Sequence, residues 1–337
     1  MNNNTTRLVQ LMHPIHQRRV ALVNEPLLVL LHPFVTIYDF ALEALRTKKP
    51  VTELIKDAAS NETLQYDLVY SGNSPWKLLP AFDHPGGPLG CLVSGTGLTH
   101  KNSALNRQMM HASGDEKPTD SIRIYQWGVD GGSPEKGIIG TQPEWFYKGN
   151  GSILTAHLNP LEIPAYANDG GEEPEIAGAY IVDEEGTPWR IGFCTGNEFS
   201  DHVMEKKNYL YLAPSKIRQC AIGPELVIDN DFSGFNGKVG INRNGTSIWS
   251  TNIVSGENNM AHSLQNLEYH HFKYASNRIP LQAHVHYFGA DAFSFGNGIV
   301  LEDGDIMEIE WNGLGRALRN PLKIIKEKEK ILEVQSL

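Results

Sequence analysis

From about residue 91 onward the chain consists of short apolar runs separated by frequent turns, and this pattern limits the possible folds more than any other feature. Short runs rich in β-branched residues and bounded by Gly, Pro, Asn and Asp are typical of strands. Many of the turns carry one of the 32 glycines of the 337-residue chain. The pattern predicts a mostly-β domain of sandwich or roll type.

The segment before this region has a different pattern, in which strand-like and helical stretches are mixed. The stretch RRVALVNEPLLVLL predicts strands, whereas VTIYDFALEALRTKK and VTELIKDAAS have helical periodicity. A Pro- and Gly-rich joint follows at 78–90. We therefore expect an α+β, mostly β chain with an N-terminal mixed α/β region (1–90) and a second domain (91–337). Helices in the second domain are predicted at 100–113 and over the last dozen residues.

Charge and composition exclude several classes of function. The formal net charge is −10, which argues against nucleic acid or an anionic membrane as the main partner. The N-terminus lacks the apolar stretch of a signal peptide, and the longest apolar run, 26–31, is too short to span a bilayer. The three cysteines, Cys91, Cys194 and Cys220, are far apart and predict neither a disulfide framework nor a thiolate zinc site. A soluble cytoplasmic protein is expected.

Two glutamates flank a proline just before a predicted strand, in the sequence GGEEPEIAGAYIVD. Residues i and i+2 of a strand point to the same face, so Glu173 and Glu175 would direct two carboxylates at one spot. A third carboxylate, Glu198 or Asp201, follows the next predicted strand. Three carboxylates suit Mg²⁺ or Mn²⁺, whereas zinc prefers His or Cys. The alternative is a solvated acidic turn.

Two lysines and two pairs of histidines are further candidates. Lys148, in PEWFYKGNGSIL, and Lys216, in LYLAPSKIRQCAIGPEL, would be surface lysines unless they lie beside a metal site. The pairs His270–His271 and His284–His286 suggest a transition-metal site. Because no suitably spaced glutamate and third histidine follow, histidines on a strand surface or at the rim of a site are favoured.

Five segments, in order, resemble motifs of the fumarylacetoacetate hydrolase superfamily over roughly residues 91–325. They are Pro143-x-x-Phe146-x-Lys148, Glu173-x-Glu175-Ile-Ala, Gly192 through Asn197-Glu198, Lys216 followed by Gly223-Pro224, and GDIMEIEWNGLGRALRNPL. The resemblance implies a mixed β-roll fold around Mg²⁺ or Mn²⁺, a homodimer, and Glu173, Glu175 and Glu198 as metal ligands. Asp201 is the reserve for the third position.

The sequence departs from the pattern of the members that cleave C–C bonds. Their His and Glu fall on Ser103 and Asn106 here, and neither side chain can act as a base near neutral pH. His100, one helical turn earlier, is a possible substitute. A threonine common in the family falls on Ala290, with Ser294 as the nearest hydroxyl.

The segments SGTGLTH, PEWFYKG and GNEFSDH are most similar to the sugar-acid branch of the superfamily. This similarity implies a metal-dependent lyase that dehydrates a 2-keto-3-deoxy sugar acid, of the 2-keto-3-deoxy-arabinonate type, to a 2,5-dioxo acid. Lys216, Lys148 and Ser103 are then expected to be catalytic, and Arg107, Thr99 and Ser294 to contact the substrate. The alternatives are an acylpyruvate-type hydrolase or decarboxylase, and an inactive sugar-acid-binding protein.

Overall fold

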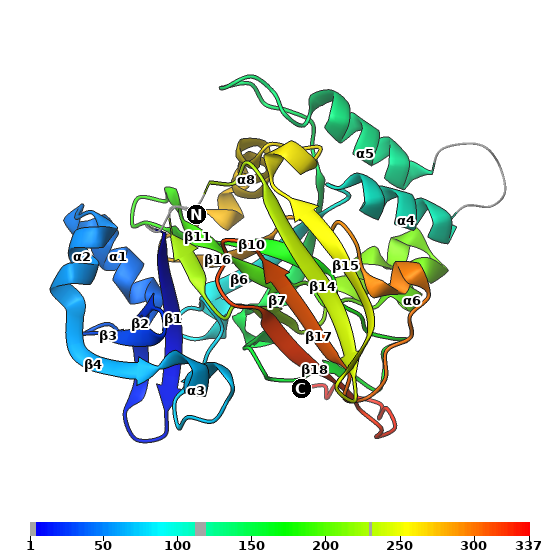
Figure 1. Cartoon of the computed structure of the whole chain (residues 1–337). Helices are drawn as coiled ribbons and strands as arrows, with labels where there is room; N and C mark the ends of the chain where they lie inside the picture. Colours follow the sequence, from blue (N-terminus) through cyan, green and yellow to red (C-terminus); the bar gives the residue numbers. More distant parts are fainter. Residues whose placement is uncertain (1–4, 112–118, 229–230) are drawn as a thin grey trace.

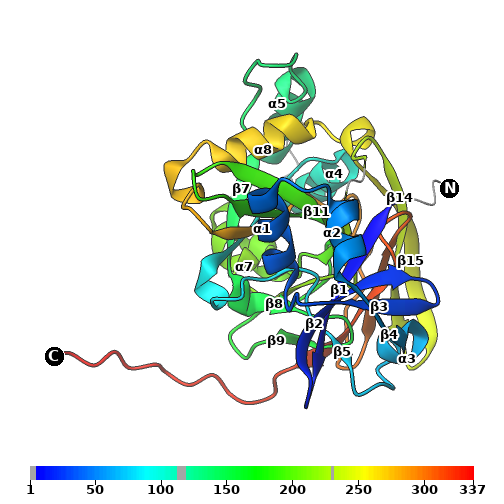
Figure 2. The same cartoon turned by 90° about the vertical axis from the view of Figure 1, so that its left-hand side faces the viewer.

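The computed structural model describes residues 5–111, 119–228 and 231–337, and its strands form two sheets (Figures 1 and 2). Along the main path of the large sheet the strands follow the order β4-β3-β2-β1-β13-β11-β10-β16-β6-β7. The small sheet has the order β15-β14-β17-β18-β9. This architecture confirms the predicted mostly-β, α+β fold class.

The elements have the following bounds. The large sheet contains β1 (Thr6–His13), β2 (Gln17–Asn24), β3 (Leu27–Leu31), β4 (Ala59–Gln65), β5 (Lys77–Leu78), β6 (Cys91–Gly97), β7 (Glu144–Asn150), β8 (Leu154–Thr155), β10 (Pro174–Val182), β11 (Pro188–Asn197), β12 (Cys220–Ile222), β13 (Leu226–Ile228) and β16 (Ala283–Tyr287). The small sheet contains β9 (Leu161–Ile163), β14 (Phe235–Arg243), β15 (Thr246–Ser255), β17 (Ile306–Trp311) and β18 (Leu318–Ile324). The helices are α1 (Ile37–Thr47), α2 (Val51–Ala58), α3 (Tyr66–Tyr70), α4 (Lys101–His111), α5 (Asp120–Gly131), α6 (His202–Lys207), α7 (Leu212–Lys216) and α8 (Leu264–Phe272).

Helix predictions were correct in part. Helices α1, α2 and α4 form where helices were predicted, although residues 112 and 113 of the predicted helix 100–113 lie outside the described residues. Helices α5 and α8 were not predicted. The last dozen residues, predicted to be helical, have no regular structure and extend from the body (Figure 2). Ile331, Leu332 and Val334 in this tail are at least 90% exposed, so no apolar face is buried that would stabilise a helix.

The N-terminal region and the rest of the chain share one sheet. Strand β1 pairs antiparallel with β13, so β1–β4 continue the large sheet beyond β13. One hydrophobic core contains Leu8, Ile37 and Phe40 from the N-terminal region together with Ala177 and Ile222 from the later part. The division at residue 90 stays a prediction, and the two parts are joined by hydrogen bonds and by packing.

Strand β10 lies inside the large sheet, between β11 and β16, and all nine of its residues are buried. One core packs between the large sheet and the helices α1 and α2. A second core packs on the opposite face, against α8 and the small sheet. The candidate site is therefore built at the start of a strand that is covered on both sides.

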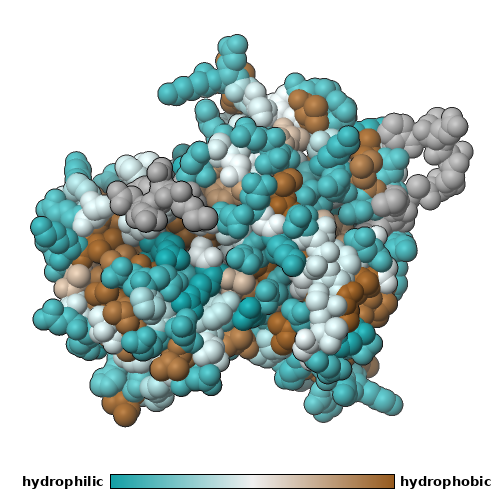
Figure 3. Space-filling view, viewed as in Figure 1, coloured by the Kyte–Doolittle hydropathy of each residue, from teal (hydrophilic) through white to brown (hydrophobic). Residues whose placement is uncertain are grey.

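None of the helices in the described ranges is both long and apolar enough to cross a membrane. On the face shown in Figure 3, hydrophilic residues predominate and the hydrophobic ones lie in scattered groups.

Candidate active site

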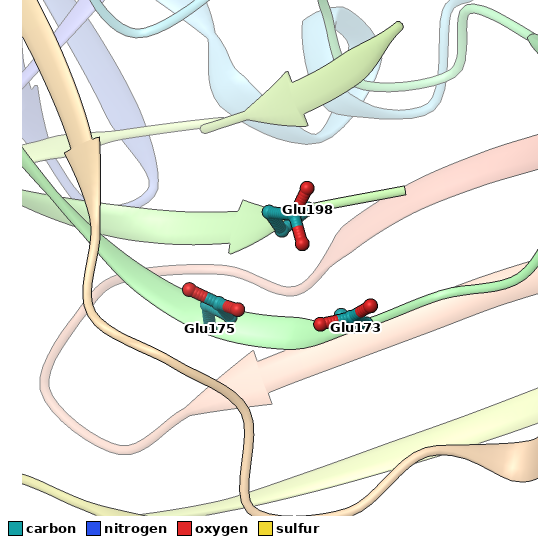
Figure 4. Close-up of side chains that lie close together, drawn as sticks. All are labelled: Glu173, Glu175 and Glu198. Atoms are coloured by element: carbon teal, nitrogen blue, oxygen red, sulfur yellow. The ribbon is translucent and has the colours of Figure 1, made fainter. Parts of the chain in front are cut away.

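Glu173, Glu175 and Glu198 converge on one point (Figure 4). Glu175 lies in β10 and Glu173 directly before it, whereas Glu198 directly follows β11. The antiparallel register brings them together, because the Glu198 amide donates a hydrogen bond to the Glu173 carbonyl over 2.9 Å. One carboxylate oxygen from each residue lies within 4.8 Å of the others. We refer to these three residues as the acidic triad.

Two buried lysines neutralise part of this charge. The Lys216 ammonium donates to Glu173 Oε1 over 2.5 Å, to Glu198 Oε2 over 2.6 Å and to Ser200 Oγ over 3.1 Å. Lys148 Nζ lies 2.6 Å from Glu198 Oε1 and donates to two backbone carbonyls. Lys148 and Lys216 are 0% and 1% exposed, so neither is the surface lysine that was the alternative.

Glu173 and Glu175 have opposite pKa shifts. Burial acts to raise the pKa of Glu173, but the Lys216 ammonium and the His202 imidazole hold it well below its ordinary value. Burial raises the pKa of Glu175 well above the ordinary value, and the charges of Glu198 and Glu173 add to the shift. Glu175 is thus the triad member whose negative charge is least compensated.

The triad fits a divalent cation of the magnesium type. All of its donors are carboxylate oxygens, which Mg²⁺ and Mn²⁺ prefer. Glu175 Oε2 accepts one hydrogen bond, from the Gly289 amide over 2.6 Å, and Glu175 has no ion pair with any described lysine or arginine. A cation bound here would compensate the charge that raises the pKa of Glu175.

Gly289 can direct its amide at Glu175 because of its backbone conformation. Its φ is +97°, and a Cβ at this position would lie 2.0 Å from Thr99 Oγ1. A side chain would therefore be excluded both by the dihedral angle and by the close approach of Thr99.

Arg107 was predicted to contact the substrate, but its guanidinium forms ion pairs with two glutamates outside the acidic triad. It extends from α4 to Glu144 at the start of β7, over 2.7 Å, and to Glu205 in α6, over 2.6 Å. All three side chains are at most 8% exposed. The ion pairs fasten α4 to the body of the protein, and a role of Arg107 in substrate binding stays a prediction.

The other predicted polar contacts are also buried and partly engaged. The Thr99 hydroxyl donates to the Phe288 carbonyl over 2.7 Å. The Ser294 amide and hydroxyl donate to the two oxygens of Glu172, over 2.6 and 2.8 Å. Ser103 is buried on α4. Their roles toward a substrate stay predictions.

Asp201, the reserve for the third metal position, is not part of the cluster. Its Oδ1 accepts the Met204 amide as the N-cap of α6, over 2.8 Å, and its Oδ2 accepts from Arg218 over 2.9 Å. The geometry therefore places Glu198 in the triad and gives Asp201 a structural role.

Two residues beside the triad were not anticipated from the sequence. Ser200 Oγ lies within hydrogen-bond distance of Lys216 and of both Glu198 oxygens. His202 Nε2 lies 3.2 Å from Glu173 Oε1. Both residues belong to the segment GNEFSDH, which had already been matched to a family motif. The contact of His202 with Glu173, however, depends on the pairing of β11 with β10, which the local sequence does not specify.

The paired histidines lie in the protein interior. His284 and His286 in β16 are 0% and 1% exposed, and His271 Nε2 lies 3.1 Å from His284 Nδ1. Burial lowers the pKa of both strand histidines to about 3. The placement on a strand surface was wrong, whereas the placement at the rim of a site stays a prediction. Among the described residues, the cluster that could hold a metal is the acidic triad.

Comparison with solved structures identifies the fold. The chain matches a structure described as 2-keto-3-deoxy-D-arabinonate dehydratase complexed with magnesium and 2,5-dioxopentanoate, with a TM-score of 0.69. The sequences are 17% identical over 95% of this chain and 100% of the other. The chain has the fumarylacetoacetate hydrolase-type fold. The motifs that suggested this fold in the sequence thus agree with the three-dimensional comparison.

The same fold occurs in enzymes of another reaction class. A 5-carboxymethyl-2-hydroxymuconate delta-isomerase from Mycobacterium smegmatis matches with a TM-score of 0.56 at 17% identity, over 95% of this chain and 100% of its own. A 2-hydroxyhepta-2,4-diene-1,7-dioate isomerase from Mycobacterium marinum matches with a TM-score of 0.57 at 15% identity, over 96% and 100%. No family model matches the chain. No curated protein sequence matches it.

Proposed function

We propose that the chain is a member of the fumarylacetoacetate hydrolase superfamily and a magnesium-dependent hydro-lyase, which dehydrates a 2-keto-3-deoxy sugar acid to a 2,5-dioxo acid. The observation that carries the proposal is the buried triad Glu173, Glu175 and Glu198 beside Lys216 and Lys148. It occurs in a fold shared with a magnesium-bound dehydratase of such an acid. A soluble cytoplasmic homodimer stays part of this proposal.

The chemistry needs one proton removed from C3 and one delivered to the departing C4 hydroxyl, so that water leaves and a C3–C4 double bond forms. A proton then moves from C5 to C3, and the resulting C4–C5 enol tautomerises to the C5 aldehyde of the 2,5-dioxo acid. Mg²⁺ held by the triad would supply a Lewis acid for the 2-oxo acid end of the substrate. Lys216 and Lys148 are the proposed groups for proton transfer or for pairing with the substrate carboxylate, because both ammonium groups border the triad. Ser103, Arg107, Thr99 and Ser294 are the proposed polar contacts.

A specific observation favours a second candidate, an isomerase or C–C hydrolase that uses His100 as a base. The Thr99 hydroxyl gives its proton to the Phe288 carbonyl, so its oxygen accepts from His100 Nδ1, 2.9 Å away. The lone pair of His100 is then on Nε2, a buried atom with no partner among the described residues. Burial lowers the pKa of His100 to about 4, which keeps this nitrogen unprotonated at neutral pH.

The test is turnover of 2-keto-3-deoxy-arabinonate with Mg²⁺, with and without a chelator. Wild type is compared with Glu175→Gln and with Glu185→Gln, which alters an exposed glutamate in the turn after the same strand. Chelator-sensitive formation of 2,5-dioxopentanoate, abolished only by Glu175→Gln, is expected.

Other outcomes separate the alternatives. Turnover that withstands the chelator contradicts the metal dependence. Release of pyruvate from an acylpyruvate, lost in His100→Gln and with no dehydration, supports the second candidate. Metal binding without turnover of either substrate supports the sugar-acid-binding alternative.

A further inference from the structure

His202 is a buried histidine beside the acidic triad to which the proposed reaction assigns no role. It is the first residue of α6 and is 2% exposed. Its ring lies between the rings of Phe293 and Phe295, with centroid separations of 4.9 and 5.1 Å and interplanar angles of 6° and 27°. Two aromatic faces therefore fix the plane of the imidazole.

The single polar contact of His202 among the described residues is with Glu173. Its Nε2 lies 3.2 Å from Glu173 Oε1. An ionised carboxylate only accepts hydrogen bonds, so Nε2 must carry the proton and donate it. Lys216 donates to the same oxygen over 2.5 Å. Both contacts act on Oε1, which leaves Oε2 as the Glu173 oxygen for a metal.

The two phenylalanines belong to a loop that also contacts the start of β10. The loop comprises residues 288–295, of which Ser294 and Phe295 begin a short 3₁₀ helix that ends at Asn297. At one end, the Gly289 amide donates to Glu175 Oε2 over 2.6 Å. At the other, Ser294 donates twice to Glu172, over 2.6 and 2.8 Å. The loop thus binds Glu172 and Glu175 directly and reaches Glu173 through His202.

We propose that His202 is a positioning residue of the candidate metal site, which orients the Glu173 carboxylate through its Nε2–H bond while Phe293 and Phe295 hold its ring. The proposal rests on the proposed metal-dependent function. Groups that orient metal ligands typically contribute about 10- to 100-fold to metal affinity. The loop and the triad then act as one unit, in which aromatic packing determines the direction of a ligand.

The test measures Mn²⁺ affinity of the full chain by electron paramagnetic resonance. His202→Phe keeps a ring between Phe293 and Phe295 but removes the donor, and His202→Gln keeps a donor but removes the ring. We expect Mn²⁺ binding about 10- to 100-fold weaker in His202→Phe, and a smaller loss in His202→Gln. His270→Phe makes the same change at another buried histidine and should leave the affinity unchanged.

Denaturant unfolding midpoints measured in EDTA show whether a variant binds Mn²⁺ more weakly because its fold is less stable or because Glu173 is no longer oriented. We expect His202→Phe and wild type to unfold at similar denaturant concentrations, while their Mn²⁺ affinities differ. If His202→Phe does not fold, Phe293→Leu is used instead, because it weakens the ring packing and leaves Nε2 in place; weaker Mn²⁺ binding is again expected.

Two results would overturn the positioning role. One is unchanged Mn²⁺ affinity in a folded His202→Phe or Phe293→Leu variant. The other is an equal loss in His270→Phe. Absence of Mn²⁺ binding by the wild type is a different failure, because it contradicts the proposed metal dependence on which this inference rests.

Discussion

At the scale of single residues, the charge of Glu175 is the least compensated in the acidic triad. Its pKa is raised well above the ordinary value by burial and by two neighbouring glutamates, and its ion-pair partner would be the metal. Taking a carboxylate out of water without an ion-pair partner costs free energy in the folded state, so removal of this charge should be stabilising. We expect Glu175→Gln to stabilise the metal-free protein by about 1–3 kcal/mol and to abolish stabilisation by Mg²⁺.

This prediction is checked by urea unfolding with EDTA and with excess Mg²⁺. Glu185→Gln, at an exposed position, should change the free energy of unfolding by no more than about 0.5 kcal/mol in either condition. A destabilised metal-free Glu175→Gln protein would mean that the carboxylate is well satisfied without a cation.

The interior histidines predict how stability depends on pH. Burial lowers the pKa of His284 and His286 to about 3 from an ordinary value of 6.5. The unfolded chain therefore takes up protons that the folded protein does not, between pH 6.5 and 3. The free energy of unfolding is therefore unaffected by protonation of these two histidines above pH 6.5. Below pH 6.5 each of them lowers it by about 1.4 kcal/mol per pH unit.

The measurement is the free energy of unfolding in EDTA at pH 7, 6 and 5. His286→Gln should lower the slope of stability against pH by about one proton below pH 6. Equal slopes in the variant and the wild type would contradict a neutral buried His286.

Sequence reasoning found part of the site and missed the rest for identifiable reasons. Glu173 and Glu175 were predictable because strand periodicity alone places them on one face. Glu198 and Lys216 needed the motif resemblance, since local pattern also allowed a solvated turn and a surface lysine. His202 was missed because its partner Glu173 lies 29 residues earlier and meets it only through the pairing of β10 with β11.

At the scale of elements, helix α4 is fastened by the ion pairs of Arg107. Removing this side chain leaves Glu144 and Glu205 buried without their partner. Breaking a buried ion pair in this way costs about 3–5 kcal/mol. We expect Arg107→Ala to lower the free energy of unfolding by that amount and to speed hydrogen exchange within 101–107.

Arg123→Ala provides the matched control. Arg123 lies in α5 and pairs with Asp120 on the surface, with 54% and 77% of the two side chains exposed. Exposed pairs contribute about 1 kcal/mol or less, so this variant should unfold nearly as wild type does. Equal losses in the two variants would contradict the anchoring role of Arg107.

Errors in the predicted elements have physical causes too. Helix α5 contains Gly128, a residue of low helix propensity, and two β-branched residues, Ile122 and Ile124, so its local pattern did not indicate a helix. Helix α8 did carry a signal, because Ser263 caps its N-terminus by accepting from the Asn266 amide. The C-terminal tail had good helix formers but packs against nothing, and short isolated helices are marginal in water.

At the scale of the whole molecule, the N-terminal region completes the large sheet. Without it, β13 would lose its partner β1, and the core around Ala177 and Ile222 would lose Leu8 and Phe40. Unpaired strand edges and exposed apolar surface promote aggregation. We therefore expect residues 91–337 expressed alone to be largely insoluble.

Removal of residues 327–337 is the control for truncation. This tail is exposed throughout, so the shortened chain should stay soluble, with an unfolding midpoint close to that of the full chain. Soluble 91–337 with a cooperative unfolding transition would instead support two independent domains.

The two buried ammonium groups have a consequence for the removal of the proposed metal. Because Lys216 and Lys148 already offset much of the charge of the three glutamates, the polypeptide carries its own counterions. We therefore expect the chain to fold without a metal, in contrast to small domains that are unfolded until a metal binds. If the proposed metal dependence holds, a chelator should abolish turnover while the protein stays folded, and added Mg²⁺ should restore turnover without a refolding step.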